Sequence, residues 1–225
     1  MTLPQPTPAA WRSVDAYLTA MLVGDDPSLT AAISGQKAAG MPAIEVVPLT
    51  GKLLHLLVRM SAARRVLEIG TLGGYSTIWL ARAVPEGGRV VTIEAETEHA
   101  RVARTNVDRA GIGDRVDIRV GVAAEVLATL DGEEPFDLVF IDADKQSNTI
   151  YLDWAARLAR PGTVVVVDNI GRAGRVADAG ATEADVVGTQ EALRMLRDDS
   201  RFDATAIQTL DAKGWDGLAI AIIQP

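Results

Sequence analysis

The sequence has 225 residues, of which 48% are apolar and 23% are charged, and its formal net charge is −8 at pH 7. This composition is typical of a folded globular protein. The acidic balance argues against a nucleic-acid partner, and no apolar run approaches the ~20 residues that span a bilayer. The first residues lack the basic and apolar regions of a signal peptide, so we expect a cytoplasmic protein. The absence of cysteine excludes disulfides, and two histidines are too few for a histidine-only zinc site.

The N-terminal quarter of the chain is predicted to be mainly helical. Residues 1–9 contain three prolines and are expected to form a mobile tail. Apolar residues at helical spacing predict a helix over 10–22, and a shorter helix is expected near Thr30–Gln36. The segment Leu49–Met60 predicts a third helix. Residues 10–48 are therefore expected to supply N-terminal helices and a lid.

Short apolar runs and helical segments alternate regularly from residue 65 onward. Strands are predicted at Arg65–Ile69, Val90–Glu94, Val116–Val120, Leu138–Asp142 and Thr163–Asp168. Helices are predicted between them at Tyr75–Ala83, Thr97–Ala110, Ala123–Leu130 and Thr149–Ala159. A helix at Gln190–Asp198 precedes two last strands, Asp203–Leu210 and Leu218–Ile223, which a glycine-containing turn joins. Pro161-Gly162 is expected to break the chain before the fifth strand, and Thr182–Asp185 to form a solvated loop.

This alternation predicts an α/β fold with a parallel sheet and helices on both faces. Uninterrupted apolar runs such as Val164–Val167 are typical of strands that are buried on both faces. The last two strands follow each other closely and are expected to pair antiparallel. No repeat or linker divides the chain, so we expect one domain spanning residues 1–225.

A glycine-rich turn and two glutamates predict an adenosine-containing cofactor. Ligands of such sheets bind beyond the carboxyl ends of the strands, where the first strand continues into Glu68-Ile-Gly70-Thr-Leu-Gly-Gly74. Glu94 ends the next strand, where a carboxylate can bind both ribose hydroxyls. This spacing alone fits NAD or S-adenosylmethionine. Leu72 occupies a glycine position of the dinucleotide motif, and Glu68 would repel a pyrophosphate but attract an ammonium, so the charges favour S-adenosylmethionine.

Three oxygen-bearing side chains at the ends of the fourth and fifth strands predict a divalent cation site. Asp142, Asp168 and Asn169 form a set of hard oxygen ligands that suits Mg²⁺. The alternative is structural, with Asp142 capping a helix and the other two residues forming a turn. Lys145 follows Asp142 by one short turn and is predicted to act as a general base toward an acceptor hydroxyl. We expect adjacent fourth and fifth strands, which favours the metal site.

The histidines and tryptophans carry weaker signals. His55 and His99 lie in helical segments and are expected to have no catalytic role. Trp79 and Trp154 are expected to be core residues. Trp215 lies in the predicted turn before the last strand, where it could also line a pocket.

Several motifs resemble the cation-dependent class I O-methyltransferases, a family that includes caffeoyl-CoA and catechol O-methyltransferases. They are VLEIGTLGGYS at Val66–Ser76, VTIE at Val91–Glu94, FIDADK at Phe140–Lys145 and RPGTVVVVDN at Arg160–Asn169. Ile44–Gly51 resembles a motif upstream of the family's glycine turn, and Trp215–Leu218 resembles its C-terminal signature. The resemblance covers about residues 40–223 and implies a Rossmann-like, seven-stranded, mostly parallel sheet with an antiparallel last strand.

The resemblance also implies the residues of the site. The S-adenosylmethionine site would comprise Ile44, Val46, Glu68, Gly70, Tyr75, Ser76, Glu94, Ala123 and Asp142. Mg²⁺ would bind Asp142, Asp168 and Asn169, with Lys145 as the base. The implied reaction methylates one hydroxyl of a vicinal-diol phenolic substrate, and family members commonly form homodimers, partly through N-terminal helices.

Three departures from the family pattern concern the acceptor. Asn148 stands where the family usually has an aromatic residue, Ala192–Leu196 replaces an expected Arg-x-Phe-Asn-like stretch, and Leu210 replaces a carboxylate. Two alternatives to a methyltransferase also stay open. They are an NAD-type oxidoreductase and a non-catalytic S-adenosylmethionine-binding protein, although a protein without catalysis has no use for the complete set of Asp142, Lys145, Asp168 and Asn169.

Overall fold

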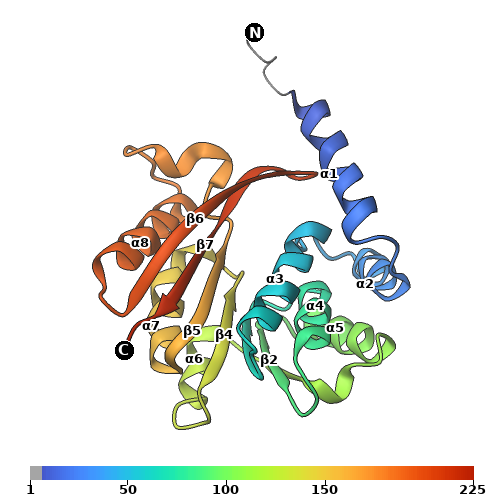
Figure 1. Cartoon of the computed structure of the whole chain (residues 1–225), viewed down its shortest axis with the longest axis horizontal. Helices are drawn as coiled ribbons and strands as arrows, with labels where there is room; N and C mark the ends of the chain where they lie inside the picture. Colours follow the sequence, from blue (N-terminus) through green and yellow to red (C-terminus); the bar gives the residue numbers. More distant parts are fainter. Residues whose placement is uncertain (1–6) are drawn as a thin grey trace.

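The computed structural model describes residues 7–225, and the fold is a seven-stranded sheet with helices on both faces (Figure 1). The strand order is β3-β2-β1-β4-β5-β7-β6. The first four strands of the chain are β1 (Arg65–Ile69), β2 (Arg89–Glu94), β3 (Val116–Val120) and β4 (Phe136–Ile141). Strands β1, β2 and β4 are largely buried, whereas β3, at the edge of the sheet, is only partly buried. The remaining strands are longer: β5 (Ala159–Asp168), β6 (Phe202–Asp211) and β7 (Gly214–Ile223). Strands β1 to β5 pair parallel, and β7 pairs antiparallel with both β5 and β6, as predicted.

Three helices form the N-terminal part of the chain, as predicted, but each begins at an earlier residue than predicted. They are α1 (Pro8–Leu22), α2 (Pro27–Ala38) and α3 (Pro48–Met60), and each begins with a proline in its first turn, where no backbone N–H is needed. The Thr7 side chain caps α1 by accepting from the Ala10 N–H. Residues 8 and 9 are therefore helical rather than part of a tail, and residues 1–6 of the predicted tail lie outside the described residues.

Alternating strand residues face two separate apolar cores. Leu67, Val139 and Val165 pack on one face, which α6 (Ala123–Thr129), α7 (Asn148–Arg157) and α8 (Ala184–Asp198) cover. Val66, Leu138 and Val166 pack on the other face, beneath α2, α3, α4 (Tyr75–Ala83) and α5 (Thr97–Arg109). Figure 1 shows α3, α4 and α5 on one side of the sheet and α6, α7 and α8 on the other. Burial on both faces explains why these strands appear as uninterrupted apolar runs.

Three local predictions were wrong in whole or in part. Pro161-Gly162 lies within β5, where the pairing register with β4 shifts between Phe136 and Leu138 and thus accommodates residues without regular partners. The predicted solvated loop Thr182–Asp185 is correct for Thr182 and Glu183, which are exposed and non-helical, but helix α8 begins at Ala184, so Asp185 is helical and pairs with Arg172. Trp215 lies in β7 and not in a turn, because the hairpin extends until only Ala212 and Lys213 connect the strands.

Candidate functional site

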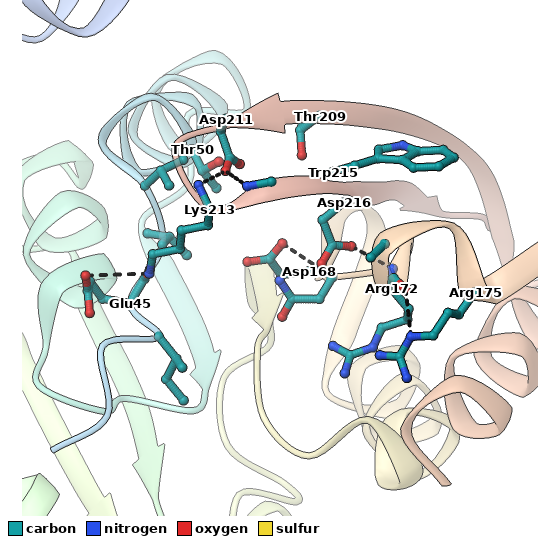
Figure 2. Close-up of a pocket in the computed structure, with 16 residues that line it drawn as sticks. Glu45, Thr50, Asp168, Arg172, Arg175, Thr209, Asp211, Lys213, Trp215 and Asp216 are labelled. Atoms are coloured by element: carbon teal, nitrogen blue, oxygen red, sulfur yellow. Dashed lines mark hydrogen bonds and ion pairs between the residues drawn. The ribbon is translucent and has the colours of Figure 1, made fainter. Parts of the chain in front are cut away.

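Two neighbouring cavities lie at the carboxyl ends of the central parallel strands. The larger, of about 810 Å³, is lined by the residues after β1, β2 and β4. The smaller, of about 340 Å³, lies between the segment 44–50, the end of β5 and the β6–β7 hairpin (Figure 2). Asn169 and Asp216 line both cavities, which therefore adjoin at the end of β5. This position is where ligands of open α/β sheets bind.

The glycine turn after β1 is shaped by its packing against the protein itself. Gly70 has φ +100°, and a Cβ there would come within 2.2 Å of the Asp142 carbonyl oxygen. A Cβ at Gly73 would come within 2.6 Å of Gln36 Oε1. Both glycines thus permit close contact with neighbouring segments of the protein. Gly70, Tyr75 and Ser76 line the larger cavity.

Glu94 presents a fixed carboxylate on the wall of the larger cavity. Its Oε2 accepts from the Leu72 N–H at 2.7 Å, and its Oε1 accepts from the Glu96 N–H at 3.0 Å. His99, in the first turn of α5, lies 3.5 Å from Oε1 and lines the same cavity. His99 was expected to have no catalytic role, and the only signal in the sequence for its position here is its spacing of five residues from Glu94.

Glu68 lies fully buried next to the larger cavity, in contact with Ser76 rather than at the cavity surface. The hydroxyls of Thr77 and Thr92 donate to its Oε2 at 2.5 and 2.6 Å. Its Oε1 is buried and has no hydrogen-bond partner within residues 7–225. Burial raises the pKa of Glu68 to about 7, from an ordinary value of 4.5. The buried Oε1 of Glu68, which lacks a donor, therefore suits the ammonium group of the predicted S-adenosylmethionine.

Asp142, Lys145, Asp168 and Asn169 meet at the junction of the cavities, because β4 and β5 are adjacent as predicted. Lys145 is buried, and its Nζ donates to Asp142 Oδ1 at 2.8 Å. Burial and the negative charge of Asp142 raise the pKa of Asp168 to about 8. Asn169 adopts φ +60°, an uncommon conformation that asparagine tolerates and that ends the strand sharply.

The donor set at this junction is a mixture of carboxylate and amide oxygens. Within residues 7–225, no three His, Cys, Asp or Glu side chains gather as a metal-binding group. The candidate set has two carboxylates, on Asp142 and Asp168, with the amide of Asn169. Hard cations such as Mg²⁺ favour these oxygen ligands and keep several waters. The two acids lie close enough to perturb each other, so a cation between them would relieve their repulsion.

Residues 42–47, which we call the strap, connect α2 to α3 and border both cavities. Gln36 Nε2 donates to the Pro42 carbonyl at 2.6 Å and to Glu45 Oε2 at 2.8 Å. Lys213, at the hairpin tip, donates to the Glu45 carbonyl, and its Nζ lies 3.5 Å from Glu45 Oε1 (Figure 2). These contacts hold the predicted cofactor residues Ile44 and Val46 against the cavities, Ile44 mostly exposed and Val46 buried.

The outer wall of the smaller cavity contains residues that the sequence analysis did not single out, namely Arg172, Arg175 and Lys213. Arg172 donates to Asp185 across the cavity rim, and Trp215 Nε1 donates to Gln208 Oε1 at 2.9 Å. Trp215 does line a pocket, whereas Trp79 is buried in the core as expected. The remaining predicted residue, Ala123, begins α6 and lines the larger cavity.

No helix within residues 7–225 combines the length and the apolar character needed to cross a membrane.

Comparisons with known proteins agree with this arrangement. A family model described as O-methyltransferase matches residues 28–217. The chain is 53% identical over 220 residues to a catechol O-methyltransferase of Mycobacterium tuberculosis, and the match covers 98% of each chain. It superposes on the O-methyltransferase of Bacillus cereus in complex with SAH with a TM-score of 0.95, at 45% identity over 97% of this chain and 100% of that chain. The structure of TomG from Streptomyces achromogenes, in complex with SAM, gives a TM-score of 0.94 at 44% identity over 98% and 100% of the chains.

The motif resemblance and the predicted class I methyltransferase fold are thereby confirmed. The chain is an enzyme of the O-methyltransferase family.

Proposed function

We propose that this enzyme transfers a methyl group from S-adenosylmethionine to one hydroxyl of a vicinal-diol aromatic acceptor, with Mg²⁺ or another divalent cation bound. The observation that carries the proposal is the position of Asp142, Lys145, Asp168 and Asn169 at the junction of a larger and a smaller cavity. A cofactor cavity and an acceptor cavity that share one polar wall suit direct transfer between two bound reactants.

The larger cavity fits S-adenosylmethionine in its chemistry. Glu94 would hold the ribose hydroxyls from the cavity wall. The unpartnered Oε1 of Glu68, which lies just behind that wall next to Ser76, would meet the amino group. Tyr75, Ser76 and Gly70 would border the amino-acid part, Ala123 the adenine, and Ile44 and Val46 would cover the cofactor. The relatives from Bacillus cereus and Streptomyces achromogenes, solved with SAH and SAM, support this assignment.

When bound, S-adenosylmethionine would supply a reactive methyl group, and a divalent cation would lower the pKa of the acceptor hydroxyls. Asp142, Asp168 and Asn169 would hold that cation. Lys145 Nζ would accept the proton of the acceptor hydroxyl, and its contact with Asp142 at 2.8 Å orients it for this role. The strap, fastened by Gln36 and Lys213, would exclude water from the reacting groups.

We also propose that the enzyme acts as a homodimer of single-domain chains in the cytoplasm. The apolar face of α1 is largely solvent-exposed in the single chain, with Val14, Tyr17, Met21 and Leu22 all more than half exposed. Such a continuous apolar face favours burial against a second copy. Light scattering after size exclusion should give the mass of a dimer, and Met21→Glu should shift it toward the monomer. A monomeric wild-type protein would contradict this proposal.

The reaction is tested by measuring S-adenosylhomocysteine (SAH) release with vicinal-diol phenols and Mg²⁺. We expect turnover by the wild-type enzyme and none by Asp168→Ala or Asn169→Ala, because each variant loses a cation ligand. Asp203→Ala is the matched control, since Asp203 is exposed on β6, and it should keep full activity. Equal activity in all four proteins would refute the assigned cation site.

A further inference from the structure

The smaller cavity has two arginines on one wall, and they share one carboxylate. Arg172 donates through Nη2 to Asp185 Oδ2, and Arg175 Nη2 lies 3.5 Å from the same oxygen. Both arginines come from the segment after β5, and Asp185 comes from the first turn of α8. Figure 2 shows the two side chains next to each other, on the Asp216 side of the cavity. One carboxylate therefore pairs with two guanidinium groups, closely with Arg172 and more loosely with Arg175.

Arg175 is the less well satisfied of the two. Its Nε donates to the Arg172 carbonyl at 3.1 Å, which leaves its terminal nitrogens with long contacts of 3.5 Å to Asp185 and 3.7 Å to Glu183. The side chains of Arg175 and Glu183 are 47% and 52% exposed, so water screens this pair strongly. A guanidinium group prefers a bidentate contact at about 2.7–2.9 Å with a carboxylate. Arg175 therefore has unused binding capacity.

The other charges on this wall have closer partners. Lys213 is held by Glu45 of the strap. Asp216 Oδ1 accepts from the N–H groups of Gly171, Arg172 and Gly217, and Asp211 Oδ1 accepts from two N–H groups of the hairpin turn. Among the described residues that line the smaller cavity, Arg175 is thus the cation best placed to take a ligand carboxylate.

The indole ring of Trp215 forms part of the same wall. A Cβ at Gly174 would come within 2.7 Å of the Trp215 ring, so the loop that carries both arginines packs directly against the indole. Arg172, Ala173 and Gly174 all have positive φ values, which gives this loop a tight and unusual path. The hydrogen bond from Trp215 Nε1 to Gln208 fixes the other edge of the ring. The cavity volume of about 340 Å³ is near the lower limit for small-molecule sites and suits one aromatic ring with a short substituent.

We propose that the acceptor is a vicinal-diol phenol that carries a carboxylate, and that Arg175, supported by Arg172, binds this carboxylate. The diol would face Asp168 and Asn169, and the ring would lie along Trp215. This inference rests on the proposed function, because it names the class of acceptor for the same transfer. It makes Arg175 a specificity-determining residue with no part in the proton transfer.

The test compares 3,4-dihydroxybenzoate with its neutral amide, which has the same ring and diol. A charge-assisted bidentate contact predicts that wild-type kcat/KM is about 10- to 100-fold higher for the acid. Arg175→Gln should reduce this ratio to about one, and Arg175→Lys should give an intermediate ratio because lysine keeps the charge without the fork. Arg157→Gln, at an exposed arginine of α7, is the matched control and should keep the wild-type ratio.

Calorimetry with SAH and Mg²⁺ present should show the same preference in the dissociation constants of the two acceptors. Methylation of acid and amide with equal kcat/KM would overturn the inference and leave the proposed function intact. A preference for the acid that persists in Arg175→Gln would also overturn it. Failure to methylate any vicinal diol would overturn the proposed function, and this inference with it.

Discussion

Replacing Lys145 by glutamine tests the chemistry at the junction of the cavities. Lys145 is 7% exposed, and its Nζ lies 2.8 Å from Asp142 Oδ1. Glutamine keeps a polar end of similar reach but cannot accept the proton of a hydroxyl. A positioned general base contributes about 10²- to 10⁴-fold to the rate, which corresponds to about 3–5 kcal/mol of the activation barrier. We therefore expect kcat to fall by that factor.

Cofactor affinity should change much less in this variant. Of the residues that we assign to the cofactor, Lys145 pairs with Asp142, which is also assigned to the cation, and it makes no hydrogen bond to Glu68 or Glu94. Two assays separate the effects: kcat from the rate of SAH formation at saturating substrates, and the dissociation constant of SAH by calorimetry. Lys37→Gln, at an exposed lysine of α2, is the control and should match the wild type in both.

The outcome that would refute this reasoning is specific. If Lys145→Gln keeps kcat within about threefold of the wild type, the side chain is not the base. If kcat and SAH affinity fall by the same factor, Lys145 shapes the cofactor cavity rather than the proton transfer. Near-ultraviolet circular dichroism should give the wild-type spectrum, so that neither result reflects misfolding.

Three further predictions concern stability and the strap. The pKa of Glu68 is raised to about 7 in the folded protein, against 4.5 when unfolded, so the free energy of unfolding of the wild type should fall by up to about 3 kcal/mol as pH rises from 4.5 to 7. Urea titrations of Glu68→Gln should lack this fall, and parallel pH profiles of the two proteins would contradict the prediction. Gly51→Ala should lower the free energy of unfolding by about 1–3 kcal/mol, because its Cβ would lie 2.3 Å from the Trp79 ring, and an unchanged melting temperature would disprove the contact. Lys213→Met should raise the acceptor KM about two- to tenfold by releasing Glu45, and an unchanged KM would show that this contact does not hold the strap during catalysis.

The sequence predicted the central sheet well because each central strand is apolar on both faces. The bounds of β1 and β3 were correct, because an arginine precedes each of these strands and a glycine follows it. The prediction failed where tertiary contacts override local signals. Helix α8 begins within the charged segment Thr182–Asp185, which was predicted to be a loop, and an ion pair between Asp185 and Arg172 stabilises its first turn. Likewise, Pro161-Gly162 is accommodated within β5 by a register shift that local sequence does not reveal.

The candidate site was predictable to the extent that it lies at strand ends. Glu94, Asp142 and Asp168 directly end or follow their strands, so parallel pairing alone brings them to one edge of the sheet. The outer wall of the smaller cavity could not be predicted in this way. The Lys213 contact with Glu45 joins residues 168 positions apart, and only the folded hairpin and strap bring them together.

The most direct test of the central claim uses the wild-type enzyme, S-adenosylmethionine and 3,4-dihydroxybenzoate. SAH and the monomethylated acceptor are quantified after exhaustive chelation, and again after Mg²⁺ is added back. We expect stoichiometric formation of both products with Mg²⁺, no formation with chelator, and full recovery on re-addition, because the proposed cation site of Asp142, Asp168 and Asn169 lies beside Lys145. Undiminished methyl transfer in the presence of chelator would contradict it.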